Sequence, residues 1–366
     1  MHRTLQACRP LGLFAISLVA IIESASAHGV GDSMAETAVR FLASLEPDQR
    51  LQAALALDAP DRAAWSFFPA HALQEGYGRP GVALGDLRPD QRLLAHKILK
   101  SALAHRGYLQ ALTVMTLEQA LHEIEDDNPH RDAGDYRLAV FGEPTHGGRW
   151  AWRFEGHHLS INLTLDGGHV VAATPSFFGS NPARVTEGAL AGTRALAAER
   201  DLALELVRSL SPEQRSGAIV SDSAPADLLT RFDPQAERSL FGNDQGILAA
   251  DLTEPQRRLL RQLVAQYTKK YRPPVLEHLP SIGELQTGEG LRKENTRFAW
   301  AGSTEPGQPC YYRVVTPSFV FEFDTPAGNA NHVHSVWRAF DGDFGRNTLA
   351  EHYRTSHRSA ETASSP

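Results

Sequence analysis

The segment EGHHLSINLTL, residues 155–165, decides the class of fold. Apolar and polar residues alternate in it from Leu159 to Leu165, and alternation with a period of two is typical of a strand that buries one face. We expect this strand to begin at His157, so that the two adjacent histidines point to opposite faces of a sheet.

More strands are predicted on both sides of this segment, and helices are predicted before them. Short runs of the same kind predict strands at residues 136–141, 150–155 and 169–174. Helical periodicity predicts helices at residues 33–45, 88–106 and 117–125, the last with Thr116 as its N-cap. A run of helices followed by a run of antiparallel strands indicates an α+β fold.

The chain also repeats itself once. SLEPDQR at 44–50 matches SLSPEQR at 209–215, and GVALGDL at 81–87 matches GILAADL at 246–252, both with a shift of 165 residues. RWAW at 149–152 then matches RFAW at 297–300 with a shift of 148. A repeat of this length predicts two similar structural units.

The second copy has the same order of elements as the first. Helices are expected at 187–210 and 254–271, strands at 297–301, 311–315, 319–323 and 332–340, and a last helix at 349–357. We therefore predict a single domain over residues 28–358, followed by a disordered tail at 359–366. Its two helix-then-antiparallel-strand halves, about 34–180 and 199–350, would be related by a pseudo-twofold axis.

The N-terminal residues have the composition of a secretory signal peptide. Two arginines precede an apolar run from Leu11 to Ile22, and Ala25-Ser26-Ala27 resembles a cleavage site. We expect removal of residues 1–27 and export to the periplasm or the extracellular space, with His28 as the new N-terminus. No later segment is long and apolar enough to predict a membrane span. The formal charge of −7 and the scattered Lys and Arg give no basic footprint, so no nucleic-acid partner is expected.

The segment NANHVHSVWRAFDGDFG, residues 329–345, suggests a site. His332 and His334 are two residues apart, so in a strand they share a face and their imidazoles can converge on one ion. Neutral imidazoles suit Zn, Cu, Fe or Ni. His158 is the candidate for the third ligand, because it begins the polar row of its expected strand.

Other residues are candidates for the surroundings of this site. His157 begins the apolar row and is expected at the edge of the core, with backbone partners for its ring nitrogens. Asn162, Arg338 and Asp343 would orient the ligands or a bound substrate. Two alternatives remain open: the histidines line a pocket for a small polar or anionic ligand, or they only form hydrogen bonds within the sheet. His28, if it became the N-terminus, could chelate copper, or its position could be an accident of the cleavage site.

Several long segments resemble those of one known family. GDYRLAVFGEP, RWAWRFEGHHLSINLTL, TPSFFGSNPARV and NANHVHSVWRAFDGDFG are similar to the signature segments of the domain of unknown function 3500 family. The resemblance extends from about Met34 to about His357. It implies that the GHH and NHVH segments are hallmarks of the family, and it implies no activity.

The sequence thus predicts an exported, soluble protein with a histidine-lined site. The leading hypothesis is a metal-dependent enzyme in which a transition metal activates water or oxygen. The rival hypothesis is a non-catalytic periplasmic protein that binds a metal or a small molecule.

Overall fold

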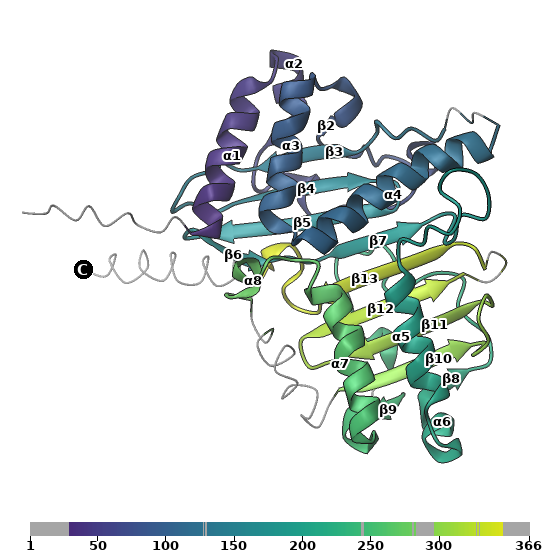
Figure 1. Ribbon diagram of the computed structural model, residues 1–366. Helices are drawn as coiled ribbons and strands as arrows, with labels where there is room; N and C mark the ends of the chain where they lie inside the picture. The colour runs from purple at the N-terminus through teal and green to yellow at the C-terminus, as the bar shows by residue number, and fades with distance from the viewer. Residues whose placement is uncertain are drawn as a thin grey trace, which may run out of the picture.

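The chain forms a mixed α/β structure with eight α-helices and one large sheet across its described residues (Figure 1). The computed structural model describes residues 29–346 except 127, 129, 243–244, 280–281, 283–295, 327 and 329. The predicted signal peptide, His28, the predicted helix at 349–357 and the predicted tail lie outside the described residues.

Four of the helices begin with the same capping device. In α2, α3, α6 and α7 a proline occupies one of the first two helical positions, where its missing N–H is not needed. A glutamine at the third position then accepts a hydrogen bond from the backbone N–H of the N-cap residue. The helices are α1 (Val30–Ser44), α2 (Pro47–Ala53), α3 (Pro89–Ala102), α4 (His105–Ile124), α5 (Ala197–Arg208), α6 (Pro212–Ala218), α7 (Glu254–Thr268) and α8 (Pro273–Leu276).

The sheet has thirteen strands and is mixed. Its main order is β1-β3-β4-β5-β7-β13-β12-β11-β10-β8, with β2, β6 and β9 paired to β3, β5 and β10. Among the strands that the structure describes, only β1 with β3 and β8 with β10 pair in parallel. The strands are β1 (Ala54–Leu55), β2 (Val82–Ala83), β3 (Arg137–Phe141), β4 (Trp150–Gly156), β5 (Leu159–Asp166), β6 (His169–Ala172), β7 (Ser176–Ser180), β8 (Ile219–Ser221), β9 (Ile247–Leu248), β10 (Arg297–Gly302), β11 (Cys310–Val315), β12 (Phe319–Thr325) and β13 (Val333–Ala339).

Helices and loops cover opposite faces of this sheet. The longer helices α1, α3, α4, α5 and α7 lie over one face (Figure 1). In β13, Val333 and Trp337 belong to the main core, which includes residues of these helices. Val336 points the other way and packs with Trp65 and Phe67 from the loop between β1 and β2. His334 and Arg338 follow the same alternation, so they lie beneath the loops rather than beneath the helices.

Strand β7 is the seam of the sheet. It pairs with β5 on one side and with β13 on the other, so residues from both parts of the chain meet there. The hairpin end of β4 and β5 and the start of β13 lie beside it, and this is the position of the candidate site.

Several details of the sequence prediction are wrong. The helix expected at 88–106 ends at Ala102, because Leu103 is extended, and the helix expected from residue 117 is the second half of α4, which begins at His105. Thr116 therefore lies inside α4 and does not cap it. The helix expected at 187–210 begins only at Ala197, because Gly188 and Gly192 have φ values of 78° and 89° and form turns before it. Residues 297–300 lie in β10, which pairs in parallel with β8 and antiparallel with β9. In the first half, β3 makes the corresponding pairs with β1 and β2. Residues 149–152 fall at β4 instead, so the match of RWAW with RFAW does not join equivalent strands.

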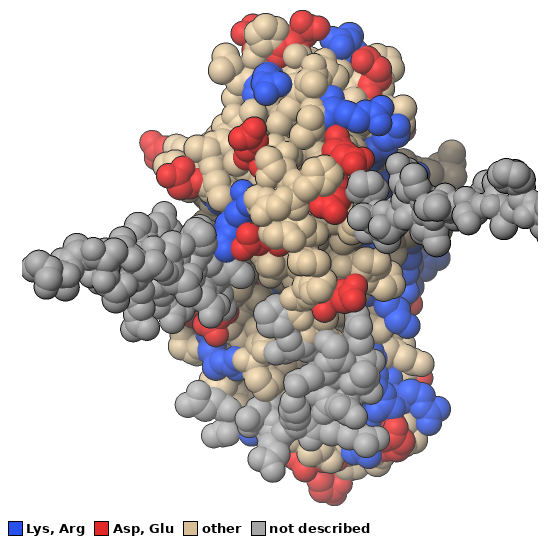
Figure 2. All heavy atoms as spheres, turned by 90° about the vertical axis from the view of Figure 1, so that its left-hand side faces the viewer, with Lys and Arg blue, Asp and Glu red and all other residues tan. Residues whose placement is uncertain are grey.

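Two further properties concern the charge of the surface and the length and apolar character of the helices. On the face shown in Figure 2, Lys and Arg are interspersed with Asp and Glu. Among the helices that the structure describes, none has the length and apolar character needed to cross a membrane.

Candidate metal centre

The two adjacent histidines form a turn and not the start of a strand. Gly156 pairs with Leu159, so His157 and His158 are the two residues that connect β4 to β5. His158 has a φ of 61°, in the left-handed region that few non-glycine residues occupy. Its N–H donates to the carbonyl of Phe67 at 3.0 Å, and its carbonyl accepts from the N–H of Gly179 at 2.7 Å. These bonds to distant segments fix the direction of the His158 ring.

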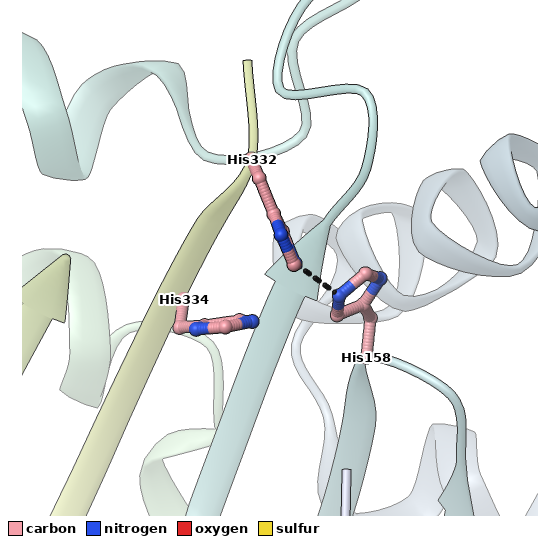
Figure 3. A group of neighbouring side chains, drawn as sticks. All are labelled: His158, His332 and His334. Atoms are coloured by element: carbon pink, nitrogen blue, oxygen red, sulfur yellow. Dashed lines mark hydrogen bonds between the residues drawn. The ribbon is translucent and has the colours of Figure 1, made fainter. Parts of the chain in front are cut away.

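The structure brings His158, His332 and His334 together. His332 immediately precedes β13 and His334 lies within it, and both rings are directed toward the tip of the β4–β5 hairpin (Figure 3). Nε2 of His158 lies 2.7 Å from Nε2 of His332. One ring nitrogen from each of the three histidines lies within 4.8 Å of the others. His158 and His334 are 3% and 4% exposed, and His332 is partly exposed.

The environment keeps two of these imidazoles neutral. Burial lowers the pKa of His158 well below its usual range, and the other histidines add to this shift. Burial also lowers the pKa of His332 to about 2, with a further contribution from His334. Two neutral rings with their Nε2 atoms 2.7 Å apart need a proton or a metal ion between them, because two lone pairs at that distance repel. Neutral imidazole is also the form that ligates metals.

His334 has a different environment. Its Nδ1 lies 3.1 Å from Asp324 and 3.3 Å from Asp227. Burial alone would lower the pKa of His334, but the two carboxylates raise it to about 9. A carboxylate behind one ring nitrogen is the usual way to orient a ligating histidine, whose other nitrogen then faces the metal. A nitrogen of His334 is indeed directed toward the other two rings (Figure 3).

His157 lies against a helix instead of joining the trio. Its Nδ1 is 2.5 Å from the carboxylate of Glu118 in α4, and both residues are buried. The expectation of backbone partners for its ring nitrogens is therefore wrong for Nδ1. Burial lowers the pKa of His157 against the opposing effect of Glu118. The neutral ring therefore donates its Nδ1–H to the carboxylate. The ring also stacks on His158, with centroids 3.8 Å apart.

Among the described residues, no hydrogen bond joins Asn162, Arg338 or Asp343 to the three histidines. The Asn162 side chain accepts from Arg153 at 2.7 Å and donates to Ser160 and to the carbonyl of Pro175. Arg338 donates to Asp343 at 2.6 Å in a separate buried network. Both groups stabilise the loop-covered face of the sheet.

Three acidic residues of the site were missed in the sequence. Glu118, Asp227 and Asp324 come from α4, from the loop after β8 and from β12. Asp324 could have been recognised as a candidate, because Glu322 and Asp324 interrupt the apolar residues of the strand FVFEFDT. No local pattern marks Glu118 or Asp227.

Gly179 is predicted to be essential for the position of His158. A Cβ at residue 179 would lie 2.7 Å from Cδ2 of the His158 ring, well inside van der Waals contact. We expect Gly179→Ala to displace this ring and weaken metal binding by at least about tenfold, because shifts of this size disturb ligand geometry. Titration of zinc into both proteins measures the effect. Gly217→Ala, in α6, is the control, because a Cβ there meets no atom within 4 Å. Unchanged affinity in the Gly179 variant would contradict this role.

Comparison with known proteins gives one match. No curated protein and no solved structure matches the chain. The profile of a family described as a protein of unknown function (DUF3500) matches residues 28–346, which is most of the chain. The match includes the hairpin turn with His157 and His158 and the strand with His334, in agreement with the resemblance seen in the sequence. The chain therefore belongs to the DUF3500 family of proteins of unknown function.

Proposed function

We propose that His158, His332 and His334 bind one transition-metal ion and that the protein is an exported metal-dependent enzyme. The observation that carries the proposal is the convergence of three buried or partly buried imidazoles, two of which approach to 2.7 Å through their Nε2 atoms. Zinc–nitrogen bonds of about 2.0–2.1 Å in tetrahedral geometry separate ligand atoms by roughly 3.0–3.5 Å. Small ring rotations would bring the three nitrogens to these separations.

The number of ligands favours an enzyme. Structural zinc sites use four protein ligands, whereas catalytic sites use three and leave a position open for water or substrate. A metal bound by the trio would supply Lewis acidity and a more acidic water at that position. The partial exposure of His332 supports an open side of the trio that faces solvent.

The rival function is a non-catalytic periplasmic protein that binds a metal or a small ligand. A carrier has to exchange its ion with partners, and it does so most readily with ligands near the surface. His158 and His334 are almost fully buried, which favours a retained ion over an exchanged one.

Elemental analysis of the untagged protein, purified from the periplasm of its host, tests the proposal. We expect close to stoichiometric Zn, Cu, Fe or Ni at this centre in the wild-type protein, and about one equivalent less metal in the His158→Ala/His332→Ala variant. A wild-type protein that contains no more metal than the variant, and that binds none of the four ions on titration, would refute the metal centre.

Metal affinity is expected to rise with pH until about pH 9. His334 has a pKa raised to about 9, so below that pH the metal must displace its proton. His158 and His332, whose pKa values are lowered, are already neutral at pH 7. The apparent affinity should therefore increase about tenfold per pH unit between pH 7 and 9, because one proton is released. Titrations against a competing chelator, corrected for metal hydrolysis, measure this slope. A plateau from pH 7 upward would contradict the raised pKa.

We also propose that the protein is exported with loss of residues 1–27. The signal-like composition of these residues supports the proposal. Intact-mass spectrometry of protein from the native host should give a chain that begins at His28. A mass that includes Met1 would refute it.

Finally, we propose that the two halves of the chain are related by a pseudo-twofold axis. Equivalent glutamines at a shift of 165 residues support the proposal. Gln91 donates to the carbonyl of Ser44 and to Gln49, and Gln256 donates to the carbonyl of Ser209 and to Gln214. The flanking strand pairs β1–β3 and β8–β10 are both parallel.

Matched substitutions at these glutamines test the equivalence. Gln91→Leu removes three hydrogen bonds. Gln256→Leu removes the equivalent three and a further one from Gln214, so each substitution should lower the free energy of unfolding by about 1–3 kcal/mol. Urea unfolding measures both values. If one substitution were neutral and the other strongly destabilising, the two positions would not be equivalent.

A further inference from the structure

Two carboxylates lie behind His334, on the side away from the other two histidines. Asp324 is the neighbour of His334 across strands β12 and β13 and is completely buried. Asp227, from the loop after β8, is partly buried and accepts a hydrogen bond from the N–H of Leu228 at 2.8 Å. One oxygen of each carboxylate lies near Nδ1 of His334, at 3.1 Å for Asp324 and 3.3 Å for Asp227.

Asp324 differs from the other buried acid on its strand. Glu322 lies two residues earlier on the same face and is also completely buried. Its oxygens accept hydrogen bonds from the N–H groups of Leu229 and Thr230 and from the hydroxyls of Thr230 and Tyr311. Among the described residues, neither oxygen of Asp324 has an aligned hydrogen-bond partner, and Nδ1 of His334 has none either. The 3.1 Å contact between them is thus within ion-pair distance but poorly aligned for a hydrogen bond.

A buried carboxylate without donors is costly, by several kcal/mol, unless a cation compensates its charge. The imidazolium of His334 is one such cation, but it satisfies neither acid with an aligned bond. A divalent metal ion would satisfy all three groups together. With bonds of about 2.0–2.2 Å to nitrogen and carboxylate oxygen, its ligand atoms would lie roughly 3.0–3.5 Å apart. The two observed separations of 3.1 and 3.3 Å fall in this range.

We propose that Asp227, Asp324 and Nδ1 of His334 form a second cation subsite for a divalent transition metal such as Zn²⁺ or Cu²⁺. When both sites are filled, His334 bridges the two ions through its two nitrogens. The imidazolium then releases both of its N–H protons to solvent, and the negative charge of the acids and the bridge is balanced by the metals. The bridge rests on the proposed three-histidine centre, whereas the subsite itself does not.

Zinc stoichiometry in site variants tests the subsite. Metal-free mature protein is titrated with Zn²⁺ and its bound metal is measured after dialysis. We expect two equivalents in the wild type, one in Asp324→Asn and one in His158→Ala. Asp227→Asn, at a more accessible position, should also retain one and serves if the Asp324 variant does not fold. Glu322→Gln is the matched control on the same strand and should retain two, with folding checked by circular dichroism.

The possible outcomes separate the two proposals. One wild-type equivalent that is lost in His158→Ala but kept in both aspartate variants overturns the second subsite and leaves the three-histidine centre intact. One equivalent that is lost in the aspartate variants but kept in His158→Ala supports the subsite and overturns the three-histidine centre. Two equivalents in both aspartate variants would also overturn the subsite.

Copper tests the bridge. Two Cu²⁺ ions joined by one imidazolate couple magnetically, so the electron paramagnetic resonance signal per copper should fall in the doubly loaded wild type. The signal should return to full intensity in Asp324→Asn, which holds a single ion. A full-intensity signal from two copper ions in the wild type would overturn the bridge.

Discussion

Replacement of His158 or His332 by alanine is expected to abolish metal binding at the three-histidine centre. Each supplies one of the three imidazoles that converge at the β5–β7–β13 seam, and their Nε2 atoms are 2.7 Å apart. Loss of an outer partner of a metal ligand already costs 10–100-fold in affinity. Loss of a ligand itself should therefore cost at least about 100-fold. Calorimetric titration with Zn, Cu, Ni and Fe measures the effect.

The choice of substitution matters at His158. Its φ of 61° is unfavourable for alanine, which would add backbone strain to the loss of the ring. Asparagine tolerates this conformation, so His158→Asn removes the ligand and preserves the turn. His96→Ala is the control, because His96 lies on α3 and its Nδ1 pairs with Tyr108. If His158→Asn bound metal as tightly as the His96 variant, the three-histidine centre would be excluded.

Much of the fold could be predicted because its signals are local. The alternation of apolar residues in 159–165 depends only on which face of the sheet is buried, and this segment is a strand. The capping glutamine follows the proline by two residues in α2, α3 and α6 and by one residue in α7, so these helix starts have a local signal. The predictions used it only in part, because they placed helices at 88–106 and 254–271 but none at α2 or α6. The family was recognised from long segments in order, and the profile match confirms it.

The hairpin turn was mistaken for a strand because its causes are not local. Two-residue turns with a positive φ usually contain glycine or asparagine, and the sequence has His157 and His158 at these positions. The turn is held instead by the carbonyl of Phe67 and the N–H of Gly179. Neither contact is visible until the loop between β1 and β2 is placed over the sheet.

The candidate ligands could be predicted from the sequence but their partners could not. The spacing of His332 and His334 places them on one face wherever the chain is extended, so their proximity needs only local structure. The contact between Glu118 and His157 joins a helix to a turn 39 residues later, and Asp227 reaches His334 from a loop. Contacts of this kind depend on how helices and loops pack against the sheet, which the periodicity of a single segment does not encode.

His157→Ala is expected to lower stability strongly and to leave metal binding in place. The ring of His157 is buried, and its Nδ1 contacts the carboxylate of Glu118, which is only 3% exposed. Without the ring, that carboxylate stays buried and loses its donor. A buried acceptor that loses its donor costs about 1–3 kcal/mol, and more when the acceptor is charged. Urea unfolding of the metal-free proteins measures the loss, and zinc titration of the folded variant measures the site.

A double-mutant cycle separates this contact from general damage to the packing. Glu118→Ala removes the acid, so the double variant Glu118→Ala/His157→Ala no longer buries an unpaired carboxylate. Its destabilisation should be smaller than the sum of the two single effects by about 1–3 kcal/mol. Additive effects would mean that the 2.5 Å contact contributes little. The ring of His157 also stacks on His158, with centroids 3.8 Å apart. Loss of zinc binding in a folded His157→Ala protein would therefore mean that His157 contributes to the metal centre and does more than support the turn.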